Sequence, residues 1–198
     1  MKILSLDISS QTGFAFFEGS KHIESGTLKM DESEISSVKA LPYPLSYIKR
    51  SERIASLLVE KVIAYSPEVV VIEETNKGKA RYTQKLLEFI HLQFLQRLTN
   101  EFQGVKIVYL NTSQWRKTLN IKATKEDKKN NSLVNQAKKN KKSKKDLGVK
   151  GKITTKHLAI RFVNDALGLD LKMKDNNTAD AIALNLAYQM GASAVSGV

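Results

Sequence analysis

The sequence predicts an α/β protein with a mixed five-stranded sheet flanked by helices. Three apolar runs at 2–8, 13–17 and 21–29 are joined by very short links, a pattern typical of an antiparallel meander. Two later apolar runs, 69–73 and 105–110, alternate with helical segments, so we expect them to lie parallel to the first strand. With 198 residues, 41% of them apolar, the chain suits one domain spanning 1–198 with an insertion.

The helices are predicted from apolar residues that recur every three or four positions. Residues 31–44 are rich in acids, Ser and Pro, and we expect a loop there. The first helix covers 45–65 and is stopped by Pro67, which cannot continue a helix. Further helices are predicted at 83–102, 154–168 and 177–190, and Asn111-Thr112-Ser113 is predicted to cap a short helix carrying Trp115, which we expect to be a core residue.

The net charge of +12 is confined to one segment. Between Arg116 and Lys156 there are 15 Lys and Arg residues and three acids, and the rest of the chain is neutral. Residues 120–150 have no apolar period, so we expect a Lys-rich, mobile insertion. Concentrated positive charge is typical of proteins that bind polyanions, although a merely solubilising loop would have the same composition.

Composition excludes several kinds of site. The chain has no cysteine and only three scattered histidines, so a bound metal would need oxygen ligands, which favours magnesium or manganese. No apolar run is long enough to span a membrane, and Met1-Lys2 leads directly into a strand with an acid, unlike a signal peptide. We therefore expect a soluble, cytoplasmic protein that does not bind membranes.

Three carboxylates lie at the ends or faces of apolar elements. Asp7 is in the first strand, Glu73 ends the fourth, and Asp180 is one turn into the last helix. A carboxylate in such a position is costly unless it is paired or binds a cation. Each also has an ordinary alternative: a strand-end turn for Asp7 and a loop or helix cap for the others. Glu74 points to the opposite face from Glu73, by the period of two.

Together the three carboxylates suggest one metal site. They can converge only if the first and fourth strands are neighbours, which the predicted order of elements allows. Two-metal sites hold their ions roughly 4 Å apart, and they activate a water and stabilise the leaving oxygen of a phosphodiester.

Four motifs resemble the RuvC-like Holliday junction resolvases of the ribonuclease H superfamily. Leu6–Ala15 resembles the first family motif, Val71–Glu74 the second and Ala179–Ala183 the last, while Trp115–Leu119 resembles a run in phage-borne members. The resemblance implies a ribonuclease H-like fold, a homodimer and cutting of four-way DNA junctions with two Mg²⁺ ions per site, for which Mn²⁺ would substitute. It assigns Asp7, Glu73 and Asp180 as catalytic metal ligands. It also implies an enzyme of a bacterial cell, encoded by the cell or by a phage.

The sequence departs from the family at Asn177. The family usually has an acid or His three residues before the last Asp, and here that residue is Asn177, on the same helical face as Asp180. We expect Asn177 to be the fourth, neutral oxygen ligand, although Asp175 could take this place.

Basic and aromatic residues near these motifs are predicted to contact DNA. The loop after the Glu73 strand should border the site, and it carries Lys77, Lys79, Arg81 and Tyr82. We expect the cations to bind phosphates and Tyr82 to stack on a base, with Lys156 also near the DNA. An ordinary polar loop is the alternative.

Other functions remain open at this stage. A nuclease of the same fold could act on RNA–DNA hybrids or structured RNA, and Asn177 could mark a catalytically degenerate junction-binding protein. An ATP-binding module of the actin or sugar-kinase type would need a second phosphate loop, which the sequence lacks, so no nucleotide cofactor is expected.

Overall fold

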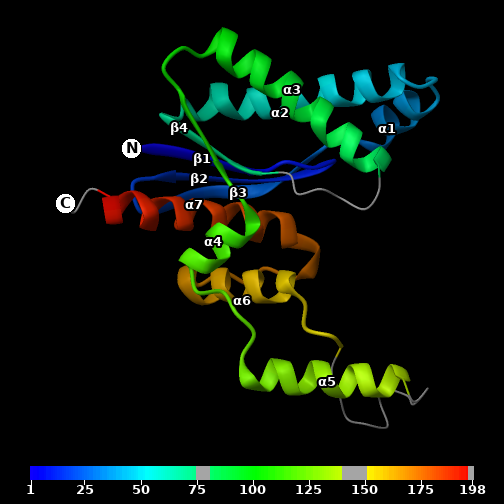
Figure 1. The fold of residues 1–198 in the computed structure, drawn as a ribbon. Coiled ribbons are helices and arrows are strands. Elements are labelled where there is room, and N and C mark those ends of the chain that lie inside the picture. The colour runs from blue at the N-terminus through cyan, green and yellow to red at the C-terminus, as the bar shows by residue number, and fades with distance from the viewer. Residues whose placement is uncertain (75–80, 140–150, 196–198) are drawn as a thin grey trace.

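A mixed five-stranded sheet forms the centre of the computed structural model, which describes residues 1–74, 81–139 and 151–195 (Figure 1). The strand order is β3-β2-β1-β4-β5. β1 is antiparallel to β2, and β2 to β3, whereas β4 is parallel to both β1 and β5, which confirms the predicted sheet. The strands are β1 (Lys2–Asp7), β2 (Gln11–Glu18), β3 (Lys21–Lys29), β4 (Val69–Glu73) and β5 (Lys106–Leu110).

Helices cover both faces of the sheet, and one helix stands apart. One face carries α1 (Glu32–Lys39), α2 (Leu45–Tyr65) and α3 (Arg81–Glu101). The other face carries α4 (Thr112–Thr118), α6 (Thr155–Leu167) and α7 (Asn176–Val195), with a short 3₁₀ helix, η1 (Met173–Asp175), before α7. Figure 1 shows α5 (Lys125–Lys139) beyond α6, away from the sheet.

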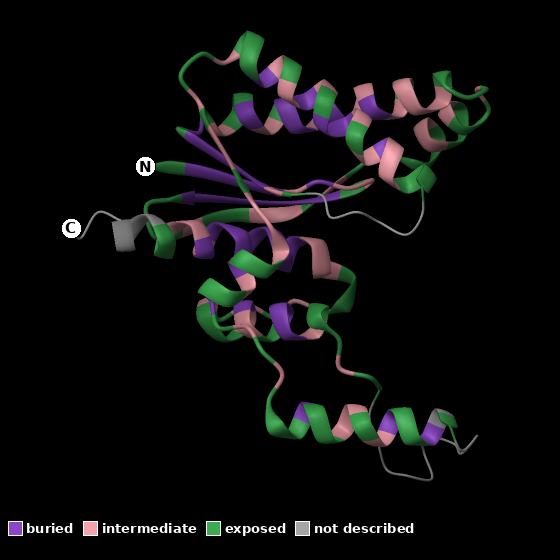
Figure 2. Cartoon of the chain, viewed as in Figure 1, coloured by how far each residue is buried: buried purple, intermediate pink, exposed green. Residues whose placement is uncertain are grey.

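The two faces have separate apolar cores because side chains alternate along each strand. Leu4, Leu6 and Ile72 pack under α2 and α3, whereas Ile3 and Val71 pack under α4, α6 and α7. Figure 2 shows the central strands buried almost throughout, as expected for a sheet covered on both sides. The continuous apolar runs in the sequence are therefore the signature of two-sided burial.

Small residues bring α7 close to the sheet. Ala181 and Ala183 are fully buried, and the Ser5 hydroxyl donates to the Ala181 carbonyl at 2.8 Å. The buried Asn185 amide donates to the Ser5 hydroxyl at 3.1 Å and to the Ile3 carbonyl at 3.3 Å. These contacts fix the height and rotation of α7 on β1, and therefore the position of Asp180.

The structure corrects the prediction of a loop over residues 31–44. Residues 32–39 form α1, which begins with a capping box: the Glu34 amide donates to Asp31 at 3.1 Å, and the Asp31 amide donates to the Glu34 carboxylate at 3.2 Å. This reciprocal cap satisfies two amides at the start of an otherwise short, exposed helix.

Within the expected mobile insertion at 120–150 no helix was predicted, but residues 125–139 form α5. Its buried face has only two buried apolar residues, Val134 and Ala137, beside polar contacts, so apolar periodicity did not predict the helix. None of the helices in the described part of the chain is long and apolar enough to cross a membrane.

Candidate active site

A cavity of about 440 Å³ lies at the carboxyl ends of β1 and β4. Parallel strands end at the same edge of a sheet, and this edge is where α/β proteins bind ligands. The cavity contains all four predicted catalytic residues and one of the predicted DNA contacts. Its lining residues are Asp7, Ile8, Ser9, Ser10, Gln11, Glu73, Glu74, Leu87, Lys156, Asn177 and Asp180.

Asp7 and Glu73 come together because β1 and β4 are neighbours in register. Leu6 is opposite Ile72, so the next residue of each strand is an acid at the same edge of the sheet. Burial, followed by the negative charges of Glu73 and Asp180, raises the pKa of Asp7 well above its ordinary value. The site therefore concentrates negative charge where water does not screen it.

Asp180 reaches the same cavity from the first turns of α7. Burial and then the charge of Glu73 raise its pKa to about 6, against the opposing charges of Arg116 and Lys156. The Asp180 Oδ1 atom is buried and has no hydrogen-bond partner among the described residues, while the Arg116 Nη2 atom lies 3.9 Å away. An unsatisfied, buried carboxylate oxygen that lines a cavity is available to a ligand.

Helix α4 holds two of the three carboxylates, a role that sequence reasoning missed. The Thr112 hydroxyl and the Trp115 indole N–H, the latter at 3.4 Å, both donate to the Glu73 Oε1 atom. The Arg116 guanidinium lies over the Trp115 ring, 4.7 Å from its centroid, on the way to Asp180. Trp115 is fully buried, which confirms it as a core residue. The signal was present in the sequence, because α4 begins just after β5, at the same sheet edge as Glu73.

Asn177 lines the cavity with its side chain already engaged. Its Nδ2 atom donates to the Gln11 carbonyl at 2.5 Å, so the amide joins α7 to β2 at the rim of the site. Asp175 does not line the cavity: its carboxylate accepts from the Lys172 amide at 2.9 Å in the cap of η1. Of the two candidates for the fourth ligand, the structure brings Asn177 to the site.

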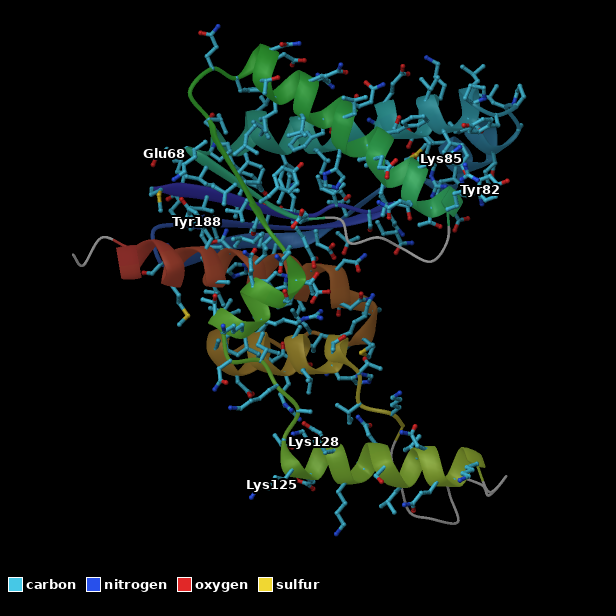
Figure 3. The ribbon with its side chains drawn as sticks, in the orientation of Figure 1. Glu68, Tyr82, Lys85, Lys125, Lys128 and Tyr188 are labelled. Atoms are coloured by element: carbon cyan, nitrogen blue, oxygen red, sulfur yellow. The ribbon has the colours of Figure 1, made fainter. Side chains whose placement is uncertain are left out.

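Lys156, near the start of α6, is the one cation that lines the cavity among the residues that the structure describes. Its Nζ atom donates to the Asn176 Oδ1 atom, and its charge lowers the pKa of Asp7 and of Asp180. Of the other predicted DNA contacts, the structure describes Arg81 and Tyr82. Arg81 and Tyr82 begin α3 and are exposed, Tyr82 by 71%, and neither lines the cavity, while Lys77 and Lys79 fall outside the described residues (Figure 3). Glu74, expected on the opposite face, also lines the cavity.

The residues fit a hard divalent cation in type and in charge. Asp7, Glu73 and Asp180 offer carboxylate oxygens, one of them without a partner, and a cation would offset the burial and mutual repulsion that raise the pKa of Asp7 and of Asp180. In the described part of the chain, no three His, Cys, Asp or Glu side chains are yet grouped closely enough to hold one ion. The carboxylates share a cavity without closing around a common point, and the Glu73 oxygen is turned toward Thr112 and Trp115.

Comparison with known proteins identifies the fold. No family model and no curated protein matches the sequence. Among solved structures, RuvC of Thermus thermophilus in complex with a Holliday junction substrate is 16% identical, with a TM-score of 0.63 over 98% of this chain and 96% of that one. The chain has the RuvC fold. A second Thermus thermophilus RuvC structure gives the same identity and coverage with a TM-score of 0.61, so the predicted ribonuclease H-like RuvC fold is confirmed.

Within this RuvC fold, Asn177→Asp tests the fourth ligand. An aspartate loses the donor to the Gln11 carbonyl and sets two acceptors against each other, so we expect a lower melting temperature in EDTA. If the site cuts DNA with magnesium, as the family resemblance implies, Asn177→Asp should keep or raise that activity, because a charged oxygen replaces a neutral one. Thermal unfolding and cleavage rates measure the two effects. A large loss of cleavage by a folded Asn177→Asp protein would remove Asn177 from the ligand set.

Proposed function

We propose that this protein is a metal-dependent endonuclease that resolves four-way DNA junctions by paired phosphodiester hydrolysis. The observation that carries the proposal is the convergence of Asp7, Glu73 and Asp180, from three separate elements, on one cavity that also contains Lys156. The RuvC fold supports it, and the structure compared above contains a Holliday junction substrate. The net charge of +12 suits a nucleic-acid partner. We further propose that the enzyme acts in the cytoplasm of a bacterial cell and that its gene is bacterial or carried by a phage.

Each residue has a distinct part in the proposed mechanism. Asp7, Glu73 and Asp180 would hold two Mg²⁺ ions, or Mn²⁺ in their place, with Asn177 as a neutral fourth ligand. Divalent cations in such a site supply an activated water and offset the charge on the leaving oxygen. Hydrogen bonds from Thr112 and Trp115 orient the Glu73 carboxylate, and Lys156 would bind an oxygen of the scissile phosphate.

The proposal includes a homodimer, because a four-way junction with two-fold symmetry needs two cuts. Helix α3 offers an exposed apolar residue in Leu92, of which 54% is accessible, whereas Leu86 on the same helix is buried in the core. We propose that the α3 surface around Leu92 contributes to the contact between subunits.

Cleavage of matched substrates tests the function. The protein is incubated with a four-way junction, a flap, a linear duplex and an RNA–DNA hybrid, each with Mg²⁺, Mn²⁺ or EDTA. We expect paired nicks at symmetric positions in the junction, dependent on either cation, and little cutting of the duplex. Preferred cutting of the hybrid would instead indicate a hybrid-specific nuclease. Tight junction binding without cutting in either metal would indicate a degenerate binding protein.

A further inference from the structure

Four of the five lysines of helix α5 share one exposed face. Lys125, Lys128, Lys129 and Lys139 are exposed, and at 3.6 residues per turn they fall within an arc of about 100°. Ser132 and Gln136, also exposed, lie on the same arc. We call these six side chains the lysine face of α5. Figure 3 labels Lys125 and Lys128 on α5, apart from the sheet and the helices that cover it.

The opposite side of α5 is turned inward. Asp127, Val134 and Ala137 are buried, and Asn131 is half-buried. On a helix these four positions lie opposite the lysine face, and Figure 2 shows the buried and exposed residues alternating along α5. The helix therefore has two distinct sides: the exposed lysine face, and a buried side that contains Asp127, Val134 and Ala137.

Two sets of polar contacts fix α5 to α6 and to the segment just before α6. The Arg161 guanidinium donates to both Asp127 oxygens, at 2.7 and 3.2 Å, in a two-point ion pair. The Asn131 amide pairs with the backbone of Ile153, donating to its carbonyl and accepting from its N–H, both at 2.8 Å. Ile153 lies three residues before Lys156, which lines the cavity. The lysine face is thus held at a set position relative to the candidate active site.

We propose that the lysine face of α5 binds the phosphate backbone of a duplex DNA arm, at a distance from the scissile phosphate that the cavity would take. This rests on the proposed function for the choice of DNA. From Lys125 to Lys139 the helix rises about 21 Å, which matches about six phosphates along one strand at 3.4 Å each. Asp127, one of the two acids on α5, is neutralised by Arg161, which leaves Glu126 as the counter-charge on this helix.

The chemistry of the face favours nucleic acid over other partners. All six side chains are polar, whereas protein interfaces have an apolar centre and few lysines. A helix that binds a membrane surface needs an outward apolar face. Lysines with Ser and Gln among them are the groups that contact phosphates without reading base sequence.

Binding in EDTA tests the proposal separately from catalysis. One variant changes Lys125, Lys128, Lys129 and Lys139 to Gln, and a control of equal charge changes the exposed Lys21, Lys29, Lys39 and Lys106 to Gln. The slope of log affinity against log salt should fall by about 0.9 per lost phosphate contact, hence by about three to four for α5. The control should keep the parent slope. Equal weakening in both variants, or none in the α5 variant, would overturn the proposal.

A second pair of variants tests the anchor. Asp127→Asn makes the protein more positive, so general charge attraction predicts tighter DNA binding. A fixed lysine face predicts the reverse: weaker binding, by severalfold, for Asp127→Asn and for Arg161→Gln, although all four lysines remain. Tighter DNA binding by Asp127→Asn would refute the proposal that the lysine face of α5 acts from a fixed position.

Duplex DNA and duplex RNA of the same sequence are compared throughout. A lysine-dependent preference for RNA would overturn the choice of DNA. Since no step requires cleavage, a protein that fails to cut junctions can still support this inference, and a junction-cutting protein can still contradict it.

Discussion

Asp7→Asn should abolish metal-dependent junction cleavage and stabilise the metal-free protein. Asp7 is a half-buried carboxylate that lines the cavity, and both Glu73 and Asp180 repel it. An amide has nearly the same shape but cannot supply the negative charge that a divalent cation requires. We expect the cleavage rate to fall on the order of 10²–10³-fold or more, with junction affinity in EDTA unchanged or higher.

The stability effect has a defined sign and pH range. The pKa values of Asp7 and Asp180 are raised in the folded state, so folding favours their protonated forms. Without metal, the parent should lose stability as the pH rises from the ordinary aspartate pKa near 4 toward about 6 for Asp180. The loss continues further for Asp7, whose pKa is raised well above its ordinary value. Asp7→Asn removes one of these charges, so its melting temperature in EDTA should exceed that of the parent at pH 8 and converge with it near pH 4.

Glu68→Gln is the matched control for this experiment. Glu68 directly precedes β4, at the opposite end from Glu73, and its side chain is 61% exposed. The control should keep the parent's cleavage and melting temperature at both pH values. Substantial magnesium-dependent cleavage by Asp7→Asn would show that Asp7 is not a ligand, and the proposed metal site would fail with it.

The sheet and the convergence of the carboxylates were predictable because the sequence carries their physical causes. Four β-branched residues before Glu73 demand burial on both sides, which only a central strand provides. Short links at the N-terminus require antiparallel pairing. Once β1 and β4 are neighbours, Asp7 and Glu73 must share an edge. The metal ions and the role of Asn177 are still predictions.

Other features depend on contacts between residues far apart in sequence. Helix α5 has few apolar residues, and a salt bridge to Arg161 and hydrogen bonds to the backbone of Ile153 help to hold it in place. No local pattern reveals these partners, which are 34 and 22 residues away. The support of Glu73 by Thr112 and Trp115 is different, because the start of α4 just after β5 indicates it once β5 is placed beside β4. The polar tertiary contacts of α5 were therefore the part of the fold that the sequence left undetermined.

Gly13→Ala should both destabilise the protein and displace Asp180. A methyl group on Gly13 would lie 1.9 Å from the Asn177 carbonyl oxygen and 2.9 Å from the Thr178 amide nitrogen, both of them backbone atoms of α7. Backbone atoms cannot turn aside as a side chain can, so the first turn of α7 must move away from β2. We expect the free energy of unfolding to fall by about 3 kcal/mol, measured by denaturant unfolding.

The same movement should impair catalysis under conditions where the variant is folded. Asp180 follows Asn177 by three residues on α7. The hydrogen bond from the Asn177 side chain to the Gln11 carbonyl joins α7 to β2 beside Gly13, so the same movement would disturb it. A displacement of about 1 Å in a catalytic group can cost roughly 100-fold in rate. The rate of cleavage of a four-way junction, compared at equal folded fraction, should therefore fall by about 10- to 100-fold.

Two other glycines separate this effect from the general cost of adding a methyl group. At Gly26 the new carbon would lie 3.0 Å from the Phe14 ring, a side-chain contact far less close than the 1.9 Å backbone contact at Gly13, so Gly26→Ala should cost less and leave the cleavage rate unchanged. At Gly151 nothing lies within 4 Å, and Gly151→Ala should be neutral. If Gly13→Ala were as stable and active as Gly151→Ala, α7 would not rest on β2 at this point. The position of Asp180 would then need another explanation, because the close approach of α7 at Gly13 is what brings its carboxylate to the edge shared by Asp7 and Glu73.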